Sequence, residues 1–532
     1  MSKATRGLKT ALLAAGIAAV GAVAGLQPAM AETVLKAKVH ADLKNIDPIW
    51  TTAYISRNHG YLIFDTLFAT DADLKVQPQM VDKWEVSSDN LVYTFTLRDG
   101  LKFHDGAPVT SEDCIASIKR WGKRDGMGQK LMDAVDRLEA VDAKTFKLVL
   151  KEPYGLVLAS LGKISSNVPF MMPKRLAETD PFEQIPESIG SGPFVFQKDK
   201  WVPGSKVVYK KNMDYKPRSE PASGAAGGKV VHYDVLEWLY MPDQNSALNA
   251  LIAGEIDYFE DPALDLVPTL KQSKDVKIHV INPLGSQGWL RINHLHPPFN
   301  NQKARQALQY MVNQEMYMQA AVGVDKNFYK LCPAMFVCDT PFATDAGSAR
   351  IMEHNMAKAK QLLKESGYTN QRVVLMQPTD LVNLNAFTLV TAQLLREVGI
   401  NLEVQAMDWS TLTSRRAMKE PLAKGGWNIF HTSWIGPDVM TPAVNIGTSG
   451  GCTERAWFGW PCDEKIEKLR GDFAKATDAA EQKKIAEAVQ MRANEIVAYV
   501  PIGQFYTPIA YRKNLTGVIE APVPFFWNIK KN

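Results

Sequence analysis

The sequence predicts an α/β fold, because patterns typical of helices and of strands alternate along it. Residues 356–367 and 388–398 show helical periodicity, and the patterns stop at Gly367 and Gly399. The second pattern is followed by an alternating apolar run at residues 400–404, which is typical of a strand. Repeated helix–glycine–strand units indicate helices packed on a sheet. With 532 residues, the chain can form two or three domains with their own cores.

Other segments support the same fold class. Residues 91–97 alternate between apolar and polar side chains, which predicts a half-buried strand. Thr110 precedes a helical pattern, and Asp113 three residues later completes a capping box. Residues 304–312 carry apolar side chains on one helical face. Residues 217–228 are rich in Pro, Ser, Ala and Gly, so we expect a flexible surface loop there.

The charge balance gives little support to a nucleic-acid partner. The net charge is +4, and basic residues within the first nine positions supply three of these charges. The rest of the chain is therefore close to neutral, without a long basic run. Binding to nucleic acid or to an anionic membrane surface depends on dense positive charge, so we expect neither partner.

The first 31 residues have the composition of a cleaved secretory signal peptide. An Ala/Leu/Val/Gly-rich stretch at residues 11–26 follows the basic start, and residues 29–31 read Ala-Met-Ala, an A-x-A cleavage site. We expect the mature chain to start at Glu32. An uncleaved membrane anchor is the alternative, although the apolar stretch is short for a span. No cysteine lies at the cleavage point, so we do not expect a lipoprotein.

The five cysteines fit an oxidising compartment outside the cytoplasm. Cys332 and Cys338 bracket one short loop, and Cys452 and Cys462 bracket another. We therefore expect two local disulfides, each stabilising by roughly 2–3 kcal/mol, with Cys114 left free. Zinc binding is the alternative, but the chain has no C-x-x-C pair and no histidines at finger spacing. We expect neither a metal nor a cofactor.

A long segment early in the chain carries the most specific motif. Residues 84–115 read WEVSSDNLVYTFTLRDGLKFHDGAPVTSEDCI. This run resembles the signature segment of family 5 solute-binding proteins, the peptide/nickel-type periplasmic binders of bacteria. One departure is Cys114, where the family usually has valine, and we interpret it as a core substitution.

Further matches follow in the family's order. Residues 190–194 (GSGPF) resemble its Gly-Thr-Gly-Pro-Phe turn, and residues 247–257 (ALNALIAGEID) resemble its helix ending in Gly-Glu-Ile-Asp. Residues 297–308 (PPFNNQKARQAL) and 394–403 (LLREVGINLE) resemble two later elements. The matches extend from about residue 34 to residue 520, so they cover nearly the whole exported chain.

The resemblance implies a bilobate periplasmic-binding-protein fold, of type II and similar to cluster C, with an extra inserted domain. After a signal peptide at residues 1–31, we expect domain I at residues 32–67, 188–285 and 504–532. Domain II would be the insertion at residues 68–187, and domain III, the second lobe, would span residues 286–503. Ligand would be enclosed between the lobes as they close.

The same resemblance implies a function in transport. The protein would capture a small solute, peptide-like or another amine-containing compound, and deliver it to the permease subunits of an ABC transporter in the inner membrane. It would be a periplasmic monomer and not an enzyme.

The resemblance also indicates ligand contacts. Trp434 belongs to a Trp-x-Gly segment that lines the cleft in family members. Asp438 follows it, where peptide-binding relatives carry an aspartate that pairs with the ligand's α-ammonium, a group that is costly to bury alone. A turn-capping aspartate is the alternative. Tyr54 lies in a stretch that relatives send into the cleft, and Trp409 offers another flat wall, although core packing is the alternative for any tryptophan.

Asp380 argues against a plain dipeptide as ligand. Residues 377–386 (QPTDLVNLNA) resemble the stretch where dipeptide binders place an arginine for the ligand carboxylate, and Asp380 occupies that place. A carboxylate there would repel the ligand carboxylate. Bare nickel is also disfavoured, because no histidine lies between Trp434 and Cys452.

Two other functions remain open from the sequence: a secreted hydrolase on a similar scaffold, and a ligand sensor for a chemoreceptor. Residues 447–451 (GTSGG) match G-x-S-x-G, but a nucleophile elbow needs a strand before and a helix after the serine. Pro442 and a Gly-Gly-Cys loop flank this motif instead. His294 and His296 can be interpreted as metal ligands, but this spacing at a strand end is more typical of a solvated polar edge.

Overall fold

The computed structural model describes residues 32–476 and 478–532. The signal peptide and cleavage site predicted at residues 1–31 therefore lie outside the described residues. Thr33–Asn532 form one compact unit, and everything below concerns this unit. Within the described residues, no helix is long and apolar enough to cross a membrane.

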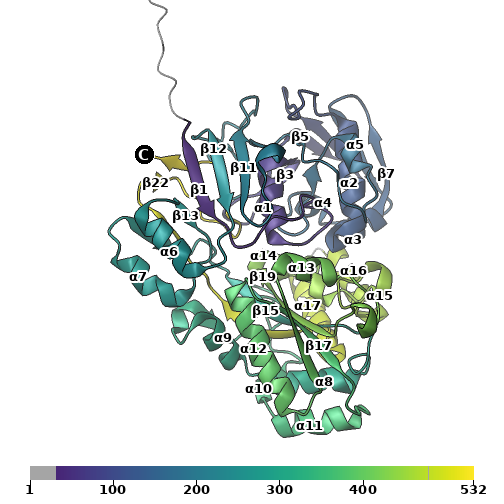
Figure 1. The fold of residues 1–532 in the computed structure, drawn as a ribbon. Helices are drawn as coiled ribbons and strands as arrows, with labels where there is room; N and C mark the ends of the chain where they lie inside the picture. The colour runs from purple at the N-terminus through teal and green to yellow at the C-terminus, as the bar shows by residue number, and fades with distance from the viewer. Residues whose placement is uncertain (1–31, 477) are drawn as a thin grey trace, which may run out of the picture. The chain divides into compact units, whose positions relative to one another are not determined.

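A seven-stranded mixed sheet collects segments from distant parts of the chain (Figure 1). Its strands, in spatial order, are β10 (Phe194–Phe196), β11 (Lys206–Lys211), β12 (Val235–Leu239), β1 (Val34–Lys38), β13 (Tyr258–Phe259), β21 (Ile509–Arg512) and β14 (Val276–His279). β1 runs parallel to β12 and to β13. These three strands therefore end at the same edge of the sheet.

A six-stranded mixed sheet is formed by residues 286–505. Its strands, in spatial order, are β16 (Tyr329–Lys330), β20 (Val500–Phe505), β15 (Ser286–Ile292), β19 (Ile429–Ile435), β17 (Val373–Pro378) and β18 (Leu402–Met407). β17 runs parallel to β18 and to β19. The C-terminal ends of these three strands also meet at one edge.

A four-stranded antiparallel sheet is formed by residues that lie between β1 and β10 in the sequence. It has the order β5 (Val81–Val86), β6 (Val92–Leu97), β8 (Thr145–Leu150) and β7 (Val135–Ala140). The predicted strand at residues 91–97 is β6, and its burial alternates as expected. The predicted capping box is confirmed: the side chain of Thr110 accepts from the Asp113 amide, and Asp113 accepts from the Thr110 amide.

Helices cover these sheets. In chain order they are α1 (Tyr54–Ile63), α2 (Ser111–Arg124), α3 (Gly126–Ala134), α4 (Val157–Leu161), α5 (Lys174–Ala177), α6 (Gln244–Ala253), α7 (Val267–Gln272), α8 (Gln302–Met311), α9 (Gln314–Val322), α10 (Ala349–Glu353), α11 (Met356–Glu365), α12 (Val382–Glu397), α13 (Trp409–Arg415), α14 (Gly436–Val439), α15 (Cys452–Arg455), α16 (Glu464–Lys475) and α17 (Ala479–Ile496). Short 3-10 turns are η1 (Lys198–Lys200), η2 (Leu264–Leu266), η3 (Lys326–Phe328), η4 (Leu422–Lys424) and η5 (Ile446–Thr448). The predicted α/β class is therefore confirmed.

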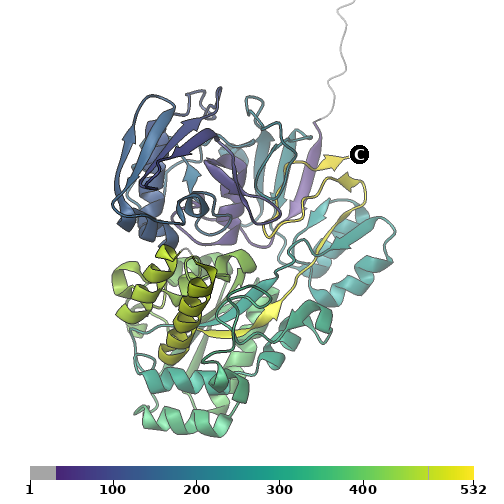
Figure 2. The ribbon, with the colours of Figure 1, turned by 180° about the vertical axis from the view of Figure 1, so that it is seen from behind.

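The chain passes twice between the two large sheets. Residues 280–285 connect β14 to β15, and residues 506–508 connect β20 to β21. In Figure 2 the second passage belongs to the yellow segment that leads from the green part to the teal strands of the seven-stranded sheet. Smaller strand pairs are β2 (Asp65–Thr66) with β9 (Phe170–Met171), β3 (Phe68–Thr70) with β4 (Val76–Pro78), and β22 (Leu515–Thr516) with β23 (Lys530–Lys531).

The loop at residues 217–228 differs from the prediction. Residues 224–228 are buried, so this half is not a surface loop. Gly224 has a φ of +56°, and a Cβ on it would lie 2.7 Å from the backbone of Asp71. Gly227 has a φ of +81°, and a Cβ there would lie 2.1 Å from the Pro221 oxygen. The glycines allow two backbone segments to pack closely here. A glycine-rich sequence is found both in such close packing and in mobile loops, so composition alone does not distinguish them.

Both predicted disulfides are present. Cys332 is bonded to Cys338 and Cys452 to Cys462. Cys114 is free and buried on α2, as expected for a core position.

Candidate functional site

A cavity of about 170 Å³ is lined by residues of both large sheets and of the passages between them. One water molecule needs roughly 10–15 Å³, so the cavity is large enough for a small solute. Its wall carries charged groups of both signs. The basic residues are Lys38, His40, Arg57 and Arg416, and the acidic residues are Glu260, Asp261 and Asp380. Aromatic walls come from Tyr54, Trp409, Trp434 and Phe505.

Three of the predicted residues meet because of the parallel strands of the six-stranded sheet. Asp380 follows β17, Trp409 follows β18, and Trp434 is the second-last residue of β19. Since these strands end at one edge, their ends converge on the cavity, and all three residues line it. The backbone amide of Trp409 donates to Oδ1 of Asp380 at 2.7 Å, which fixes the two loops together.

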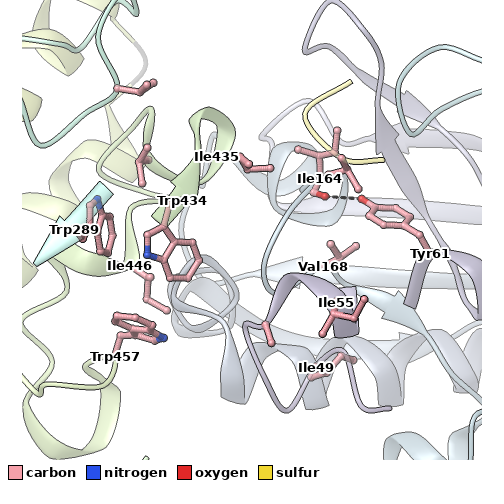
Figure 3. Packing of buried hydrophobic residues seen from close by; sticks show 14 of the residues in the cluster. Ile49, Ile55, Tyr61, Ile164, Val168, Trp289, Trp434, Ile435, Ile446 and Trp457 are labelled. Atoms are coloured by element: carbon pink, nitrogen blue, oxygen red, sulfur yellow. Dashed lines mark hydrogen bonds between the residues drawn. The ribbon is translucent and has the colours of Figure 1, made fainter. Parts of the chain in front are cut away.

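Trp434 is both a wall of the cavity and part of an aromatic cluster. Its ring centroid lies 5.4 Å from that of Trp289, 5.3 Å from Trp457 and 6.0 Å from Tyr54. Figure 3 shows Trp434 facing Trp289 and Trp457. The side chain is only 2% exposed. Trp434 therefore lines the cavity and also packs in the core.

Tyr54 begins α1 and lines the cavity. Its hydroxyl donates to Oδ2 of Asp438 at 2.7 Å and accepts from the Ile435 amide at 2.8 Å. α1 comes from the N-terminal segment, whereas Asp438 belongs to α14, which follows β19. This one hydroxyl therefore links the parts of the chain that carry the two large sheets.

Asp438 is not among the residues that line the cavity. It is buried, and its Oδ2 accepts from Tyr54 and also from the Ser165 hydroxyl at 2.7 Å. Burial raises the pKa of this carboxyl group, while Lys163 and Arg57 act in the opposite direction. Asp438 thus lies behind Tyr54 and fixes the position of its hydroxyl group. A direct contact between Asp438 and a ligand ammonium stays a prediction.

Arg57 extends the same network toward the cavity. Its Nη1 donates to the Ser165 hydroxyl at 2.7 Å, and its guanidinium lies 4.0 Å from the ring centroid of Tyr54. Burial lowers the pKa of Arg57, and the charges of Asp438 and Glu260 act against this shift. The loop that carries Ser165 is fixed to α1 by a hydrogen bond of 2.6 Å from Tyr61 to the carbonyl of Ile164 (Figure 3).

The seven-stranded sheet contributes an ionic cluster at the ends of its parallel strands. Lys38 ends β1 and His40 follows it, while Glu260 and Asp261 follow β13. His40 Nδ1 lies 3.0 Å from Glu260 Oε1, and the His40 amide donates to Oε2 at 3.0 Å. Burial raises the pKa of Asp261, and the charge of Glu260 adds to that shift. Burial lowers the pKa of Lys38.

Asp380 is an acidic group of the opposite wall. Its Oδ2 accepts a hydrogen bond of 3.1 Å from the Tyr240 hydroxyl, next to the end of β12. Burial raises the pKa of Asp380 above its usual value. Carboxylates of Glu260, Asp261 and Asp380 therefore reach the cavity from both sheets, an arrangement that can bind a cationic group.

Arg416 is the C-cap residue of α13, seven residues after Trp409, so both lie on one face of the helix. The side chain is 1% exposed, and its Nη2 donates to the Thr52 hydroxyl at 2.9 Å. Its guanidinium lies over the rings of Trp457 and Phe458, at 5.2 and 4.9 Å from their centroids. Burial lowers the pKa of Arg416 to about 9.

The sequence did not point to the charged residues of the cavity other than Asp380. These are Lys38, His40, Arg57, Glu260, Asp261 and Arg416. Two signals were available: Glu260 and Asp261 come three and four residues after the Gly-Glu-Ile-Asp element, and Arg416 follows Trp409 by two helical turns. Their burial depends on contacts between distant segments, which periodicity does not reveal.

The alternative chemical sites find no support in the structure. The hydroxyl of Ser449 donates to Glu467 Oε1 at 3.2 Å, and the serine lies after a short 3-10 turn and not at the end of a strand. The Nε2 atom of His294 is buried without a hydrogen-bond partner among the described residues, and burial lowers the pKa of this histidine well below its usual value. Among the described residues, no group of three or more His, Cys, Asp or Glu side chains is placed to hold a metal ion.

Comparison with known proteins decides the family. The model of bacterial extracellular solute-binding proteins, family 5, matches residues 75–457. The chain belongs to this family. A Sinorhizobium fredii protein named "Probable peptide ABC transporter periplasmic-binding protein y4tO" is 38% identical over 531 residues, 98% of each chain. The glutathione-binding protein GsiB of Salmonella typhi is 27% identical over 516 residues, 94% of this chain and 95% of that protein.

Among solved structures, the agropinic acid complex of the periplasmic binding protein AgaA from A. tumefaciens superposes with a TM-score of 0.77 at 22% identity. It covers 94% of this chain and 99% of that chain. The bilobate α/β fold expected of this solute-binding protein is therefore confirmed. Its function is that of the substrate-binding protein of an ABC transporter, and family 5 proteins are binding proteins rather than enzymes.

Proposed function

We propose that this family 5 protein captures a small peptide-like or other amine-containing solute in the cavity and delivers it to the permease of an ABC transporter. The observation that carries the proposal is the group of three carboxylates, Glu260, Asp261 and Asp380, on the cavity wall. A buried cation is stable only beside such partners. The names of the relatives, which include peptide and glutathione binders, point to the same class of ligand.

Asp380 is the acidic group that we assign to the ligand amine. Its two oxygens are held by Tyr240 and by the Trp409 amide, so the carboxylate is fixed in place at the cavity wall. Glu260 is already paired with His40, which leaves less of its charge for a ligand. Trp409 and Trp434 supply flat surfaces for the apolar part of the solute.

The division of the chain into domains belongs to this proposal. Domain I comprises residues 32–67, 188–285 and 504–532, domain II comprises residues 68–187, and domain III comprises residues 286–503. The two passages at residues 280–285 and 506–508 then act as the hinge. Contacts such as that between Tyr54 and Asp438 form when the lobes close over the solute. We propose that the protein acts as a periplasmic monomer and catalyses no reaction.

A thermal-shift screen on ligand-stripped protein tests the function. The compounds are di- to tetrapeptides, glutathione and agropinic acid, each with an N-acetylated counterpart where the amine allows it. We expect compounds with a free amine to raise the melting temperature and to be recovered unchanged. Asp380→Asn should lower the affinity for the amine and reduce the preference over the acetylated form.

The contrary results are equally clear. Equal binding of the acetylated and free forms would contradict the amine assignment, and consumption of a compound would contradict a pure binding role. Asp472→Asn is the matched control, because Asp472 lies on the exposed face of α16 in an i,i+4 pair with Lys468. We expect this variant to bind as the wild type does.

A further inference from the structure

The two disulfides of this protein differ in their exposure to solvent. Cys332 is fully buried and Cys338 is half-buried. The amide of Cys332 donates to Oε1 of the buried Gln314 at 2.8 Å. The amide of Cys338 donates to Oε1 of the buried Gln504 at 3.0 Å. This disulfide is therefore shielded from an attacking thiol and belongs to the core.

The second disulfide lies at the surface. Cys452 is half-buried and Cys462 is exposed. Backbone contacts close the same loop, because the amide of Cys452 donates to the carbonyl of Pro461 at 3.1 Å and Gly451 pairs with Cys462. A thiolate must reach one of the two sulfur atoms to break a disulfide, so exposed disulfides exchange more readily than buried ones. The Cys452–Cys462 bond is thus open to exchange in the folded protein.

The loop that this disulfide closes carries a contact with α3. Arg455 is the last residue of α15, and its two Nη atoms donate to the two carboxylate oxygens of Asp133 at 2.8 and 3.2 Å. Asp133 lies on α3, between strands of the four-stranded sheet, whereas α15 lies between strands of the six-stranded sheet. This bidentate ion pair therefore joins two parts of the chain that are far apart in the sequence (Figure 1).

A second ion pair joins the same two parts and is also connected to the disulfide loop. Lys130 precedes Asp133 by three residues on α3, and its Nζ lies 2.9 Å from Oε2 of Glu467 on α16. The other oxygen of Glu467 accepts from the amide of Gly450 at 2.9 Å. The carbonyl of Gly450 accepts from the amide of Asp463, directly after the loop, at 2.9 Å. The loop and its two ends therefore connect to both ion pairs.

We propose that the Cys452–Cys462 disulfide is a thiol–disulfide exchange site, and that its reduction by a dithiol loosens the contact of α15 and α16 with α3. A thiolate of the dithiol attacks Sγ of Cys462, the sulfur–sulfur bond breaks, and Cys452 leaves as a thiolate. The second thiolate of the dithiol then attacks its own sulfur in the mixed disulfide and releases Cys462. Two electrons pass from the dithiol to the protein, the two cysteines take up the two protons, and the dithiol becomes a disulfide.

Reduction acts through the conformational freedom of the loop. The intact bond restrains residues 452–462, and breaking it returns entropy to this segment. An exposed ion pair contributes little by itself, because holding its two side chains in one geometry opposes the attraction. The pair of Arg455 with Asp133 therefore depends on a loop that is already held in place. The partner of this chemistry is a protein dithiol of the Cys-x-x-Cys class, and dithiothreitol replaces it in the test.

The first measurement is the rate at which dithiothreitol reduces each disulfide in the native protein. The freed thiols are alkylated with iodoacetamide and assigned by peptide mass spectrometry. We expect Cys452–Cys462 to be reduced at least 10-fold faster than Cys332–Cys338, which is the internal control. Equal rates, or faster reduction of Cys332–Cys338, would overturn the exchange site.

The second measurement reports the contact with α3. A zero-length carbodiimide joins the amine of Lys130 to the carboxylate of Glu467 when the two are paired, and mass spectrometry quantifies the product. We expect its yield to fall at least 2-fold after selective reduction and alkylation. The product between Lys303 and Glu365, an exposed pair within residues 286–503, is the control and should stay constant. Loss of both products together would indicate unfolding and would contradict the proposal.

Variants separate this disulfide from the other one. Cys452→Ser combined with Cys462→Ser should give the low yield with and without dithiothreitol. Cys332→Ser combined with Cys338→Ser should respond to dithiothreitol as the wild type does. A cross-link that is absent from the oxidised wild type, unchanged by reduction, or full in the Cys452 and Cys462 double variant would overturn the proposal. Since no solute is added, these readouts do not change if the proposed amine ligand is wrong.

Discussion

The hydroxyl of Tyr54 donates a hydrogen bond of 2.7 Å to Oδ2 of Asp438, and these residues belong to parts of the chain that carry different sheets. Ser165 donates to the same oxygen at 2.7 Å. A buried carboxylate depends on such donors, because an unsatisfied buried acceptor destabilises the protein by its full desolvation free energy. In the closure that we propose, the pair stabilises the closed form.

Tyr54→Phe removes the hydroxyl and keeps the ring. We expect the closed, ligand-bound form to be weakened by about 1–3 kcal/mol, the penalty for an unsatisfied buried group, and affinity for the solute to fall accordingly. Titration calorimetry measures the loss, and small-angle scattering with ligand reports incomplete closure. Tyr310→Phe on α8, outside the cavity wall, is the control. Unchanged affinity in Tyr54→Phe would show that closure does not use this contact.

The pair of His40 and Glu260 gives the stability a pH dependence. Burial alone would lower the pKa of His40, but the charge and hydrogen bond of Glu260 outweigh it, so its pKa is raised above 6.5. The pKa of Glu260 is lowered below 4.5, because His40 and Lys38 outweigh the effect of its burial. The stabilisation is therefore fully present between about pH 5 and pH 6.5 and is lost as the pH rises through the raised pKa of His40.

The measurement is the free energy of unfolding of wild type and His40→Gln from about pH 5 to pH 9. The difference between them should be largest near pH 6 and should shrink toward pH 9. His279→Gln is the control, because His279 pairs with Glu520 on the surface, where the glutamate side chain is 73% exposed, and such pairs contribute little. A difference that grows with pH would refute this assignment.

Two substitutions of Trp434 separate its contribution to the cavity wall from its contribution to core packing. We expect Trp434→Ala to lose about 3–5 kcal/mol of stability, because it leaves a cavity beside Trp289 and Trp457. Trp434→Phe should fold with a small loss and bind the solute several-fold more weakly. Thermal unfolding and calorimetry measure the two effects. Trp84→Ala is the control, since Trp84 is 38% exposed and should lose much less. Full affinity in Trp434→Phe would remove this tryptophan from the ligand contacts.

The two disulfides close loops of similar length, with sequence separations of 6 and 10. Replacing Cys332 and Cys338 together by alanine should lower the free energy of unfolding by about 2 kcal/mol, as expected from loop entropy. Urea denaturation under oxidising conditions measures this loss. A double variant as stable as wild type would show that this bond contributes nothing, and reductant should affect wild type more than the variant.

The fold could be predicted because its signals are local. The capping box of Thr110 and Asp113, the strand at residues 92–97 and the glycines that end helices each depend on a few neighbouring residues. The loop at Gly224 and Gly227 was predicted wrongly as a surface feature. Glycine-rich segments occur both where two backbones approach closely and where a loop is flexible.

The site could be predicted only in part. Tyr54, Asp380, Trp409 and Trp434 line one cavity. The ends of parallel strands bring the last three together, and Tyr54 comes from the start of α1. Arg416 was missed, because an arginine at the end of a short helix is usually solvated, and its burial depends on Thr52, Trp457 and Phe458 from distant segments. Whether Asp438 touches the ligand depends on the orientation of Tyr54, which the sequence does not encode locally.

The most direct test of the central claim is mass spectrometry of the compound that denaturation releases from natively purified protein, followed by its titration back into stripped protein. We expect one small solute with a free amine, bound with a stoichiometry of one and recovered chemically unchanged. A solute without an amine, or one that the protein consumes, would contradict the proposed function.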